Sequence, residues 1–269
     1  MLGAIIGDIV GSRFEWNNNR TKEFEFFHHK CFFTDDTVMT LAIAKAILNS
    51  KENYSDLGLL SVKYMQEIGR NYPNSGYGIS FYHWMFSNNP KPYNSFGNGA
   101  AMRISAVGFV AKSIEEAIML SRKVTEVTHN HPEGIKGAEA TAVAIFLAKN
   151  GSNIKEIKNH IDKNYYKMNF KLDNIRETYK FNETCQETVP QAITAFLESI
   201  SFEDAIRNAI SIGGDSDTLA SITGGIAEAY YGIPNEIKKQ ALIFLDERLL
   251  KILIEFENKY PLPIKKTDI

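Results

Sequence analysis

The most regular feature of the sequence is the spacing of its apolar residues, which recur every three or four positions over most of its length. This spacing is typical of an amphipathic helix, whereas a half-buried strand would alternate apolar and polar side chains. The clearest stripe runs from Val38 to Ile47, after a polar start at Thr34 and before a stop at Asn49 and Ser50. Because no convincing alternating run is present, the sequence predicts an all-α protein.

The same spacing, taken together with helix caps and with breaks at proline and glycine, predicts helices over most of the remaining chain. Loops rich in turn-forming residues are expected at 71–78 and 87–99, and the whole chain, 1–269, is interpreted as a single domain. We expect further helices over Leu2–Phe14, Leu57–Arg70, Ala100–Ala111, Ile114–Thr128, Gly134–Lys149, Ile154–Tyr165, Val189–Ser199, Phe202–Ile212, Asp217–Tyr231 and Asn235–Lys259.

The first predicted helix is lined with glycine, at Gly3, Gly7 and Gly11. A glycine inside a helix costs up to about 1 kcal/mol relative to alanine. Three of them on one helix therefore predict close packing against another backbone rather than a place on the surface.

Composition narrows the class of protein without identifying it. The chain is 44% hydrophobic and 23% charged, which is ordinary for a globular protein, and its net charge is −2. That balance gives no reason to expect binding to nucleic acid or to a membrane. Cys31 and Cys185 are isolated in the sequence, which favours a reducing compartment over a disulfide framework. We therefore expect a cytoplasmic protein.

Two acidic segments that contain threonine stand at predicted helix starts, Thr34–Thr37 and Gly213–Thr218. Taken singly, each is interpreted as a helix cap, because side-chain oxygens accept hydrogen bonds from the free N–H groups of a first turn. A cap needs one oxygen, yet each segment supplies two carboxylates and at least one hydroxyl. Neighbouring carboxylates repel one another, and their burial without a counter-ion is costly.

Hard divalent cations supply such a counter-charge and prefer oxygen ligands. Asp215 and Asp217 can converge on one ion, whereas Asp35 and Asp36 can do so only if the helix has not fully begun at Thr34. If the two segments face each other, their oxygens suit two Mg²⁺ or Mn²⁺ ions better than one. The sequence contains no Cys and His cluster that would favour zinc.

The sequence resembles the ADP-ribosylglycohydrolases, the family that includes dinitrogenase-reductase-activating glycohydrolase and the eukaryotic ADP-ribosyl-acceptor hydrolases. Five motifs occur in the expected order between Gly3 and Gly232, which is most of the chain. They are GAIIGDIVGSRFE, FTDDTVMT, SFGNGAAMR, THNHPEGIKGA and GGDSDTLASITGGIAEAYYG. Any one of them is weak evidence, and the order of all five carries the resemblance.

The resemblance implies a compact all-α fold of orthogonal helices with a binuclear magnesium or manganese site, in which Asp217 bridges the two ions. Glu15 matches a glutamate beside the metals, so the candidate catalytic residues are Glu15, Asp36 and Asp215. The expected ligands are Thr34, Asp35, Asp36 and Asp217 for one ion, and Asp215, Asp217 and Thr218 for the other.

The resemblance also implies where a substrate would bind. The loop Ser95, Phe96, Gly97, Asn98 and Gly99 matches one that contacts a diphosphate and ribose. Gly76 and Gly78 match a second glycine loop near the phosphates, and His129 or His131 matches a histidine near the substrate. Taken singly, these residues have plainer interpretations as a turn, a core phenylalanine and a polar loop.

The implied activity is cleavage of the bond between ADP-ribose and an acceptor, which is either an ADP-ribosylated protein or a small ADP-ribose conjugate. Two alternatives remain: an inactive member that binds ADP-ribose or serves as a structural protein, and a two-metal nucleotide phosphoesterase. The loop from Asn71 to Ser80 contains no acid to face a guanidinium. The sequence therefore leaves the acceptor open, and also the oligomeric state.

Overall fold

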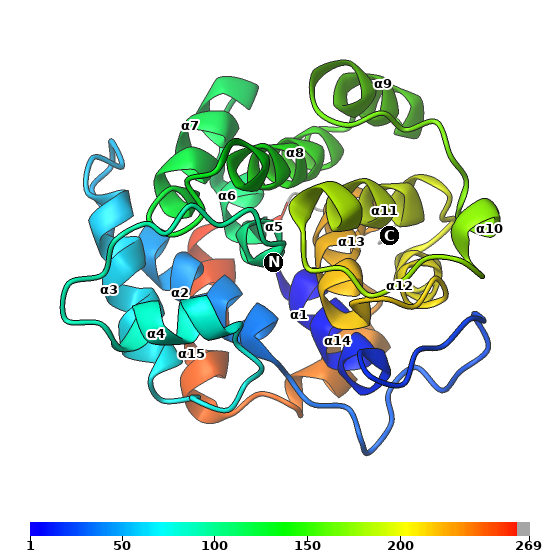
Figure 1. Ribbon diagram of the computed structural model, residues 1–269, viewed down its shortest axis with the longest axis horizontal. Helices are drawn as coiled ribbons and strands as arrows, with labels where there is room; N and C mark the ends of the chain where they lie inside the picture. The colour runs from blue at the N-terminus through cyan, green and yellow to red at the C-terminus, as the bar shows by residue number, and fades with distance from the viewer. Residues whose placement is uncertain (263–269) are drawn as a thin grey trace.

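The computed structural model describes residues 1–262, and within that range it contains helices and no β-strand (Figure 1). This confirms the predicted all-α class. The single domain expected over 1–269 stays a prediction, and its last residues, 263–269, lie outside the described range. The helices are α1 Leu2–Gly11, the 3₁₀ turn η1 Ser12–Phe14, α2 Asp35–Asn49, α3 Leu57–Gly69, α4 Ile79–Phe86, α5 Gly99–Met102, α6 Ser105–Val110, α7 Ile114–Thr125, α8 Pro132–Lys149, α9 Ile154–Asn164, α10 Leu172–Ile175, α11 Cys185–Leu197, α12 Phe202–Ile210, α13 Ser216–Tyr231, α14 Asn235–Leu242 and α15 Glu247–Lys259.

Helices α1 and α13 pack against each other at the centre of the molecule (Figure 1). An added Cβ on Gly7 would lie only 2.0 Å from the carbonyl oxygen of Ala220, and one on Gly224 only 2.1 Å from that of Gly3. Real Cβ atoms do not approach a backbone so closely, so glycine is required at both places. The prediction that the first helix packs tightly against another backbone is therefore confirmed.

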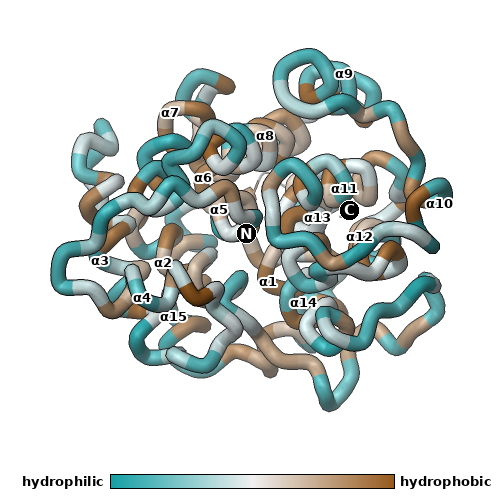
Figure 2. Tube along the Cα trace, in the orientation of Figure 1, coloured by the Kyte–Doolittle hydropathy of each residue, from teal (hydrophilic) through white to brown (hydrophobic). Residues whose placement is uncertain are grey.

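The core surrounds this pair of helices. One connected cluster of buried apolar side chains includes residues from Met1 to Phe256. In Figure 2 the hydrophobic colours gather on the central helices α1, α8 and α13, and the hydrophilic colours on the outer loops. No helix among the described residues is long and apolar enough to cross a membrane.

Two predicted helices are each divided in the structure. The one expected over Ala100–Ala111 is broken at Arg103 and Ile104, between α5 and α6. The one expected over Asn235–Lys259 is interrupted after Leu242, because the side chain of Asp246 caps α15 and accepts a hydrogen bond from Leu249 N at 3.0 Å. Unbroken apolar spacing had concealed both interruptions.

Other boundaries also differ from the prediction. Helix α11 begins four residues before the predicted start at Val189 and continues through Pro190. The loop at 71–78 is followed by a short helix, α4, where the sequence showed only an aromatic stretch, and α10 was not predicted.

Candidate active site

The turn before α13 depends on two consecutive glycines. Gly213 and Gly214 have φ angles of +69° and +75°, in the left-handed region that side chains disfavour. The chain then enters α13, with Asp215 at the N-cap position and Asp217 in the first turn. Both carboxylates are buried. The glycine turn therefore delivers two acidic side chains to the mouth of one helix.

The second acidic helix start is anchored by Asp8, a buried residue of α1. Its Oδ1 accepts a hydrogen bond from Thr34 Oγ1 at 2.7 Å, and its Oδ2 accepts bonds from Thr34 N at 2.9 Å and Thr37 N at 3.0 Å. The hydroxyl of Thr37 also donates to Oδ2. Asp8 was not among the predicted site residues, although a carboxylate inside an apolar, glycine-lined helix is a signal of a buried polar role.

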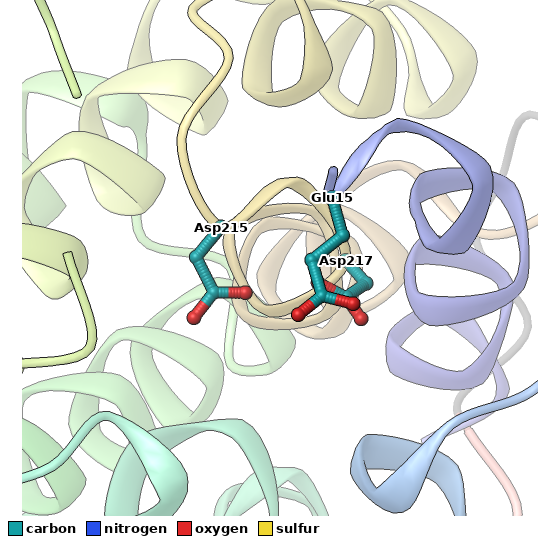
Figure 3. Close-up of side chains that lie close together, drawn as sticks. All are labelled: Glu15, Asp215 and Asp217. Atoms are coloured by element: carbon teal, nitrogen blue, oxygen red, sulfur yellow. The ribbon is translucent and has the colours of Figure 1, made fainter. Parts of the chain in front are cut away.

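The two helix starts face each other. Thr218 Oγ1 donates to Asp36 Oδ2 at 3.2 Å, which joins the start of α13 to the first turn of α2. Oxygen atoms of Glu15, Asp215 and Asp217 all lie within 4.8 Å of one another. Figure 3 shows these three side chains gathered at the start of α13, with Glu15 coming from the segment after η1.

Asn18 holds the Glu15 segment against the glycine turn. Its Nδ2 donates to the carbonyl oxygens of Phe14 at 2.8 Å and Gly214 at 3.0 Å, and its Oδ1 accepts from Gly214 N at 2.9 Å. These bonds join segments almost two hundred residues apart in the sequence. A single asparagine in a polar loop gives no sequence signal for this role.

Burial and mutual repulsion act against ionisation throughout the cluster. Burial is the main cause that raises the pKa of Asp35, Asp36 and Asp217 well above the ordinary range, and the neighbouring carboxylates raise it further. The pKa of Asp215 is raised by burial as well. Burial, followed by the charge of Asp215, raises the pKa of Glu15 to about 7. Burial also raises the pKa of Asp8 to about 6, although the four hydrogen bonds oppose this.

The donor set of this cluster fits divalent cations. Within residues 1–262, none of these carboxylates has an ion pair with lysine, arginine or histidine. Asp36 Oδ1 is buried and has no hydrogen-bond partner among the described residues. A buried carboxylate oxygen without a partner is costly, and a hard cation is the partner that satisfies it.

The predicted ligands do not all occupy equivalent places. Thr34 caps α2 by accepting from Asp36 N at 3.3 Å, so its hydroxyl is engaged on both sides. The side chain of Asp35 lies beside Gly76, whose added Cβ would be 3.3 Å from Asp35 Oδ1. Neither Asp35 nor Asp36 belongs to the group of three carboxylates within 4.8 Å. Their assignment to an ion stays a prediction.

The glycine loop before α5, Ser95–Gly99, is hydrogen-bonded to the segment that leads into α11. Asn98 N donates to Glu183 O at 2.7 Å, and Cys185 N donates to Phe96 O at 2.9 Å. Within the loop, Ser95 Oγ accepts from Gly97 N at 3.1 Å. The side chain of Asn98 is buried and donates to Asp215 Oδ2 at 2.7 Å. The loop is thus connected directly to the carboxylate cluster.

The two predicted histidines have different surroundings. His129 is buried, and added Cβ atoms on Gly97 and Gly99 would lie 3.5 and 3.4 Å from its Nε2. His131 caps α8, accepting from Glu133 N at 3.1 Å, and its ring centroid lies 5.1 Å from that of the exposed Phe96.

The two predicted glycines of the other loop, Gly76 and Gly78, also have different surroundings. Gly76 has φ +100° and lies beside Asp35, whereas an added Cβ on the exposed Gly78 would meet no atom within 4 Å. Of these two glycines, the structure therefore brings Gly76 beside an acidic residue of the predicted site.

Comparison with known proteins adds family relationships to this geometry. The sequence pattern of a family described as ADP-ribosylglycohydrolase matches residues 1–256. ADP-ribosylhydrolase ARH3 from Xenopus tropicalis is 26% identical, with 86% of this chain and 86% of that protein covered. ARH3 from Homo sapiens is 25% identical, with 87% and 84% covered. ADP-ribosylarginine hydrolase Tri1 from Pseudomonas putida (strain GB-1) is 25% identical, with 87% and 70% covered.

A solved structure shares the fold as well. It is described as an ADP-ribosylglycohydrolase-related protein complex, and it superposes with a TM-score of 0.68 at 21% identity. The superposition covers 96% of this chain and 95% of that one. At this identity the likeness concerns the arrangement of the helices.

Proposed function

The chain belongs to the ADP-ribosylglycohydrolase family, and from this premise we propose that it hydrolyses the bond between the anomeric carbon of ADP-ribose and an acceptor. The observation that carries the proposal is the convergence of Glu15, Asp215 and Asp217 beside the contact between Thr218 and Asp36. Cleavage at an anomeric carbon passes through a positively charged, oxocarbenium-like sugar, which nearby carboxylates stabilise. The carboxylates of this cluster supply the negative charge that such a sugar needs nearby.

Glu15 is the residue best suited to hold or release a proton in this reaction. In the metal-free protein, burial and then the charge of Asp215 raise its pKa to about 7, near neutral pH, where a general acid or base is most effective. Its side chain is less buried than those of Asp215 and Asp217, so a substrate can reach it. In this proposal Asp36 and Asp215 stabilise the charge on the ribose, and Glu15 transfers the proton.

We assign two Mg²⁺ or Mn²⁺ ions to the cluster. Asp35, Asp36 and Asp217 with the oxygen of Thr34 would hold one ion, and Asp215, Asp217 and Thr218 the other. When bound, the ions would offset part of the negative charge of the buried carboxylates and would orient the ribose hydroxyls. The unpartnered oxygen of Asp36 and the raised pKa values across the cluster support this assignment.

The glycine loop is the proposed diphosphate contact. The backbone of Gly97 and Gly99 permits close approach of phosphate oxygens, because neither residue has a side chain. Asn98, which hydrogen-bonds Asp215, links this loop to the ribose end of the site. The exposed Phe96, whose ring adjoins His131, offers an aromatic face for the adenine.

An experiment with three substrates would identify the acceptor to which the ADP-ribose is linked. Arginine-, serine- and O-acetyl-linked ADP-ribose would each be incubated with the protein, with and without Mg²⁺, and the products read by mass spectrometry. We expect metal-dependent release of ADP-ribose from at least one substrate. Release of phosphate instead would indicate a nucleotide phosphoesterase, and binding without turnover of any substrate would indicate an inactive member of the family.

A further inference from the structure

Arg103 is an unusual residue for the interior of this protein. It is 1% exposed and lies at the break between α5 and α6, four residues after the glycine loop. Within residues 1–262 no carboxylate lies within ion-pair distance of it, and its Nε has no hydrogen-bond partner. A buried cation without an ion pair is expensive. The contacts that Arg103 does make therefore indicate its role.

Those contacts converge on one histidine. Arg103 Nη2 donates to Thr128 Oγ1 at 2.6 Å and lies 3.4 Å from His129 Nδ1. Thr128 Oγ1 lies 2.7 Å from the same Nδ1. The guanidinium also lies 5.7 Å from the ring centroid of Phe81, which provides a favourable cation–π contact.

The chemistry of these groups determines where the proton of His129 resides. A guanidinium only donates hydrogen bonds, so a proton on His129 Nδ1 would face a cationic donor 3.4 Å away, which favours Nδ1 as the acceptor. Thr128 Oγ1 accepts from Arg103, and its own hydrogen has two acceptors in reach, His129 Nδ1 at 2.7 Å and the carbonyl oxygen of Thr125 at 3.4 Å, of which Nδ1 is the nearer. The ring is therefore neutral, with its proton on Nε2. Burial and the charge of Arg103 both hold the pKa of His129 well below its usual range, and the ring of Tyr93 also faces it, with the two ring centroids 5.9 Å apart.

The protonated nitrogen faces the glycine loop. Positions that a Cβ would occupy on Gly97 and Gly99 lie 3.5 and 3.4 Å from Nε2. No residue in the part of the chain that the structure describes makes a hydrogen bond to this atom. A fixed N–H donor thus faces two glycines, close enough that an added Cβ on either would contact it.

We propose that Arg103 is a positioning residue, which keeps His129 neutral and protonated on Nε2 so that the ring presents a fixed donor to an anionic oxygen of a bound nucleoside diphosphate. The identity of that ligand as ADP-ribose rests on the proposed function. The state of the ring rests only on the contacts of Arg103 and Thr128.

Nitrogen-15 NMR of the histidine rings tests the ring state in the ligand-free protein. The chain contains six histidines, and the signals of His129 are assigned by their loss in His129→Gln. We expect Nε2 to carry the proton and Nδ1 to carry none from pH 8 to pH 5.5. A ring that carries its proton on Nδ1, or that becomes doubly protonated in this range, overturns the proposal.

Variants of Arg103 test whether this residue sets the protonation state of His129. Arg103→Met removes the donor and the positive charge beside Nδ1, so Nδ1 is expected to gain a protonated population. Arg103→Lys retains a cation that only donates and should preserve the wild-type ring state. Arg122→Met, which removes an arginine from the surface of α7, is the matched control, and the ring state should persist. An unchanged ring in folded Arg103→Met, or a changed one in Arg122→Met, overturns the proposal.

Calorimetric titration with ADP-ribose gives the second readout. A hydrogen bond to a charged group contributes enough that its disruption in Arg103→Met should weaken binding about tenfold, with Arg103→Lys closer to wild type. Affinity unchanged in Arg103→Met would contradict the donor role. If the wild-type protein does not bind ADP-ribose at all, the proposed function fails while the NMR result on the ring still stands.

Discussion

At the scale of single residues, the site depends on buried carboxylates that have no lysine, arginine or histidine partner within residues 1–262. Residue types were predictable from the sequence, since acids, hydroxyls and glycines stand at two helix starts. Their partners were not. The sequence could not show that Asp8 would accept four hydrogen bonds from Thr34 and Thr37, or that Asn98 would donate to Asp215. Such pairings depend on distances between segments far apart in the chain.

Asp217→Asn is the sharpest test at this scale. Asparagine keeps the size of the side chain and removes the charge, so we expect loss of Mn²⁺ binding, measured by electron paramagnetic resonance, and a fall in ADP-ribose release of at least about 100-fold. The helical circular dichroism spectrum should be unchanged. Glu236→Gln, in the exposed first turn of α14, is the control and should behave as wild type. Wild-type turnover in Asp217→Asn, or in excess EDTA, would contradict the two-metal proposal.

Asp8→Asn tests whether a residue that anchors the start of α2, without being a proposed metal ligand, is needed for metal binding. An amide in this place brings an N–H against the donors of Thr34 or Thr37, so a buried donor loses its acceptor. We expect a loss of about 1–3 kcal/mol in the free energy of unfolding, measured by urea denaturation, together with weaker Mn²⁺ binding. Thr37→Ser, which keeps the hydroxyl, serves as the control. Full stability and full Mn²⁺ affinity in Asp8→Asn would show that the anchor is dispensable.

At the scale of secondary-structure elements, the contact between α1 and α13 positions the site. Asp8 and the Glu15 segment come from one side of this contact, and Asp215 and Asp217 come from the other. An added Cβ on Gly11 would lie 2.6 Å from the Cα of Asp217, so the two backbones touch at the carboxylate cluster itself. Because such contact leaves no room for a side chain, the spacing of the site is determined by glycine as much as by the acids.

Gly7→Ala should therefore harm both stability and function. Its Cβ would lie 2.0 Å from Ala220 O, so the helices must separate, at a cost of about 1–3 kcal/mol or more. We expect a lower melting temperature and weaker Mn²⁺ binding. Gly78→Ala, whose new Cβ would meet no atom within 4 Å, is the matched control for stability. Equal melting temperatures for the two variants would mean that the backbones can separate at little cost.

At the scale of the whole molecule, the buried acids connect stability to pH and to metal. The pKa of Asp8 is raised to about 6 and that of Glu15 to about 7, while both are near 4 in an unfolded chain. The folded state thus binds these protons more tightly than the unfolded state does. Their stabilising contribution is complete below about pH 4 and is lost as pH rises through 6 and 7.

We accordingly expect the metal-free protein, in EDTA, to melt at a higher temperature at pH 6 than at pH 8. Divalent cations bind the ionised carboxylates, so Mg²⁺ or Mn²⁺ should raise the melting temperature most at pH 8 and weaken or reverse the trend. Differential scanning calorimetry measures both effects. Asp217→Asn, which removes one buried charge, should show less of each. A metal-free protein that is most stable at pH 8 would contradict this account of the cluster.

The sequence by itself determined the all-α class, the tight packing of the glycine-lined first helix and the two acidic helix starts, because local spacing and residue type carry that information. It missed the breaks at Arg103 and before Asp246, since an apolar stripe continues across both. Only the tertiary structure decided that Glu15, Asp215 and Asp217 converge, that Asp8 and Asn18 hold their segments, and that Arg103 has no ion pair within residues 1–262 and contacts His129. The physical reason is that hydrogen bonds and charge interactions act over a few ångströms, and folding alone determines which distant residues come that close.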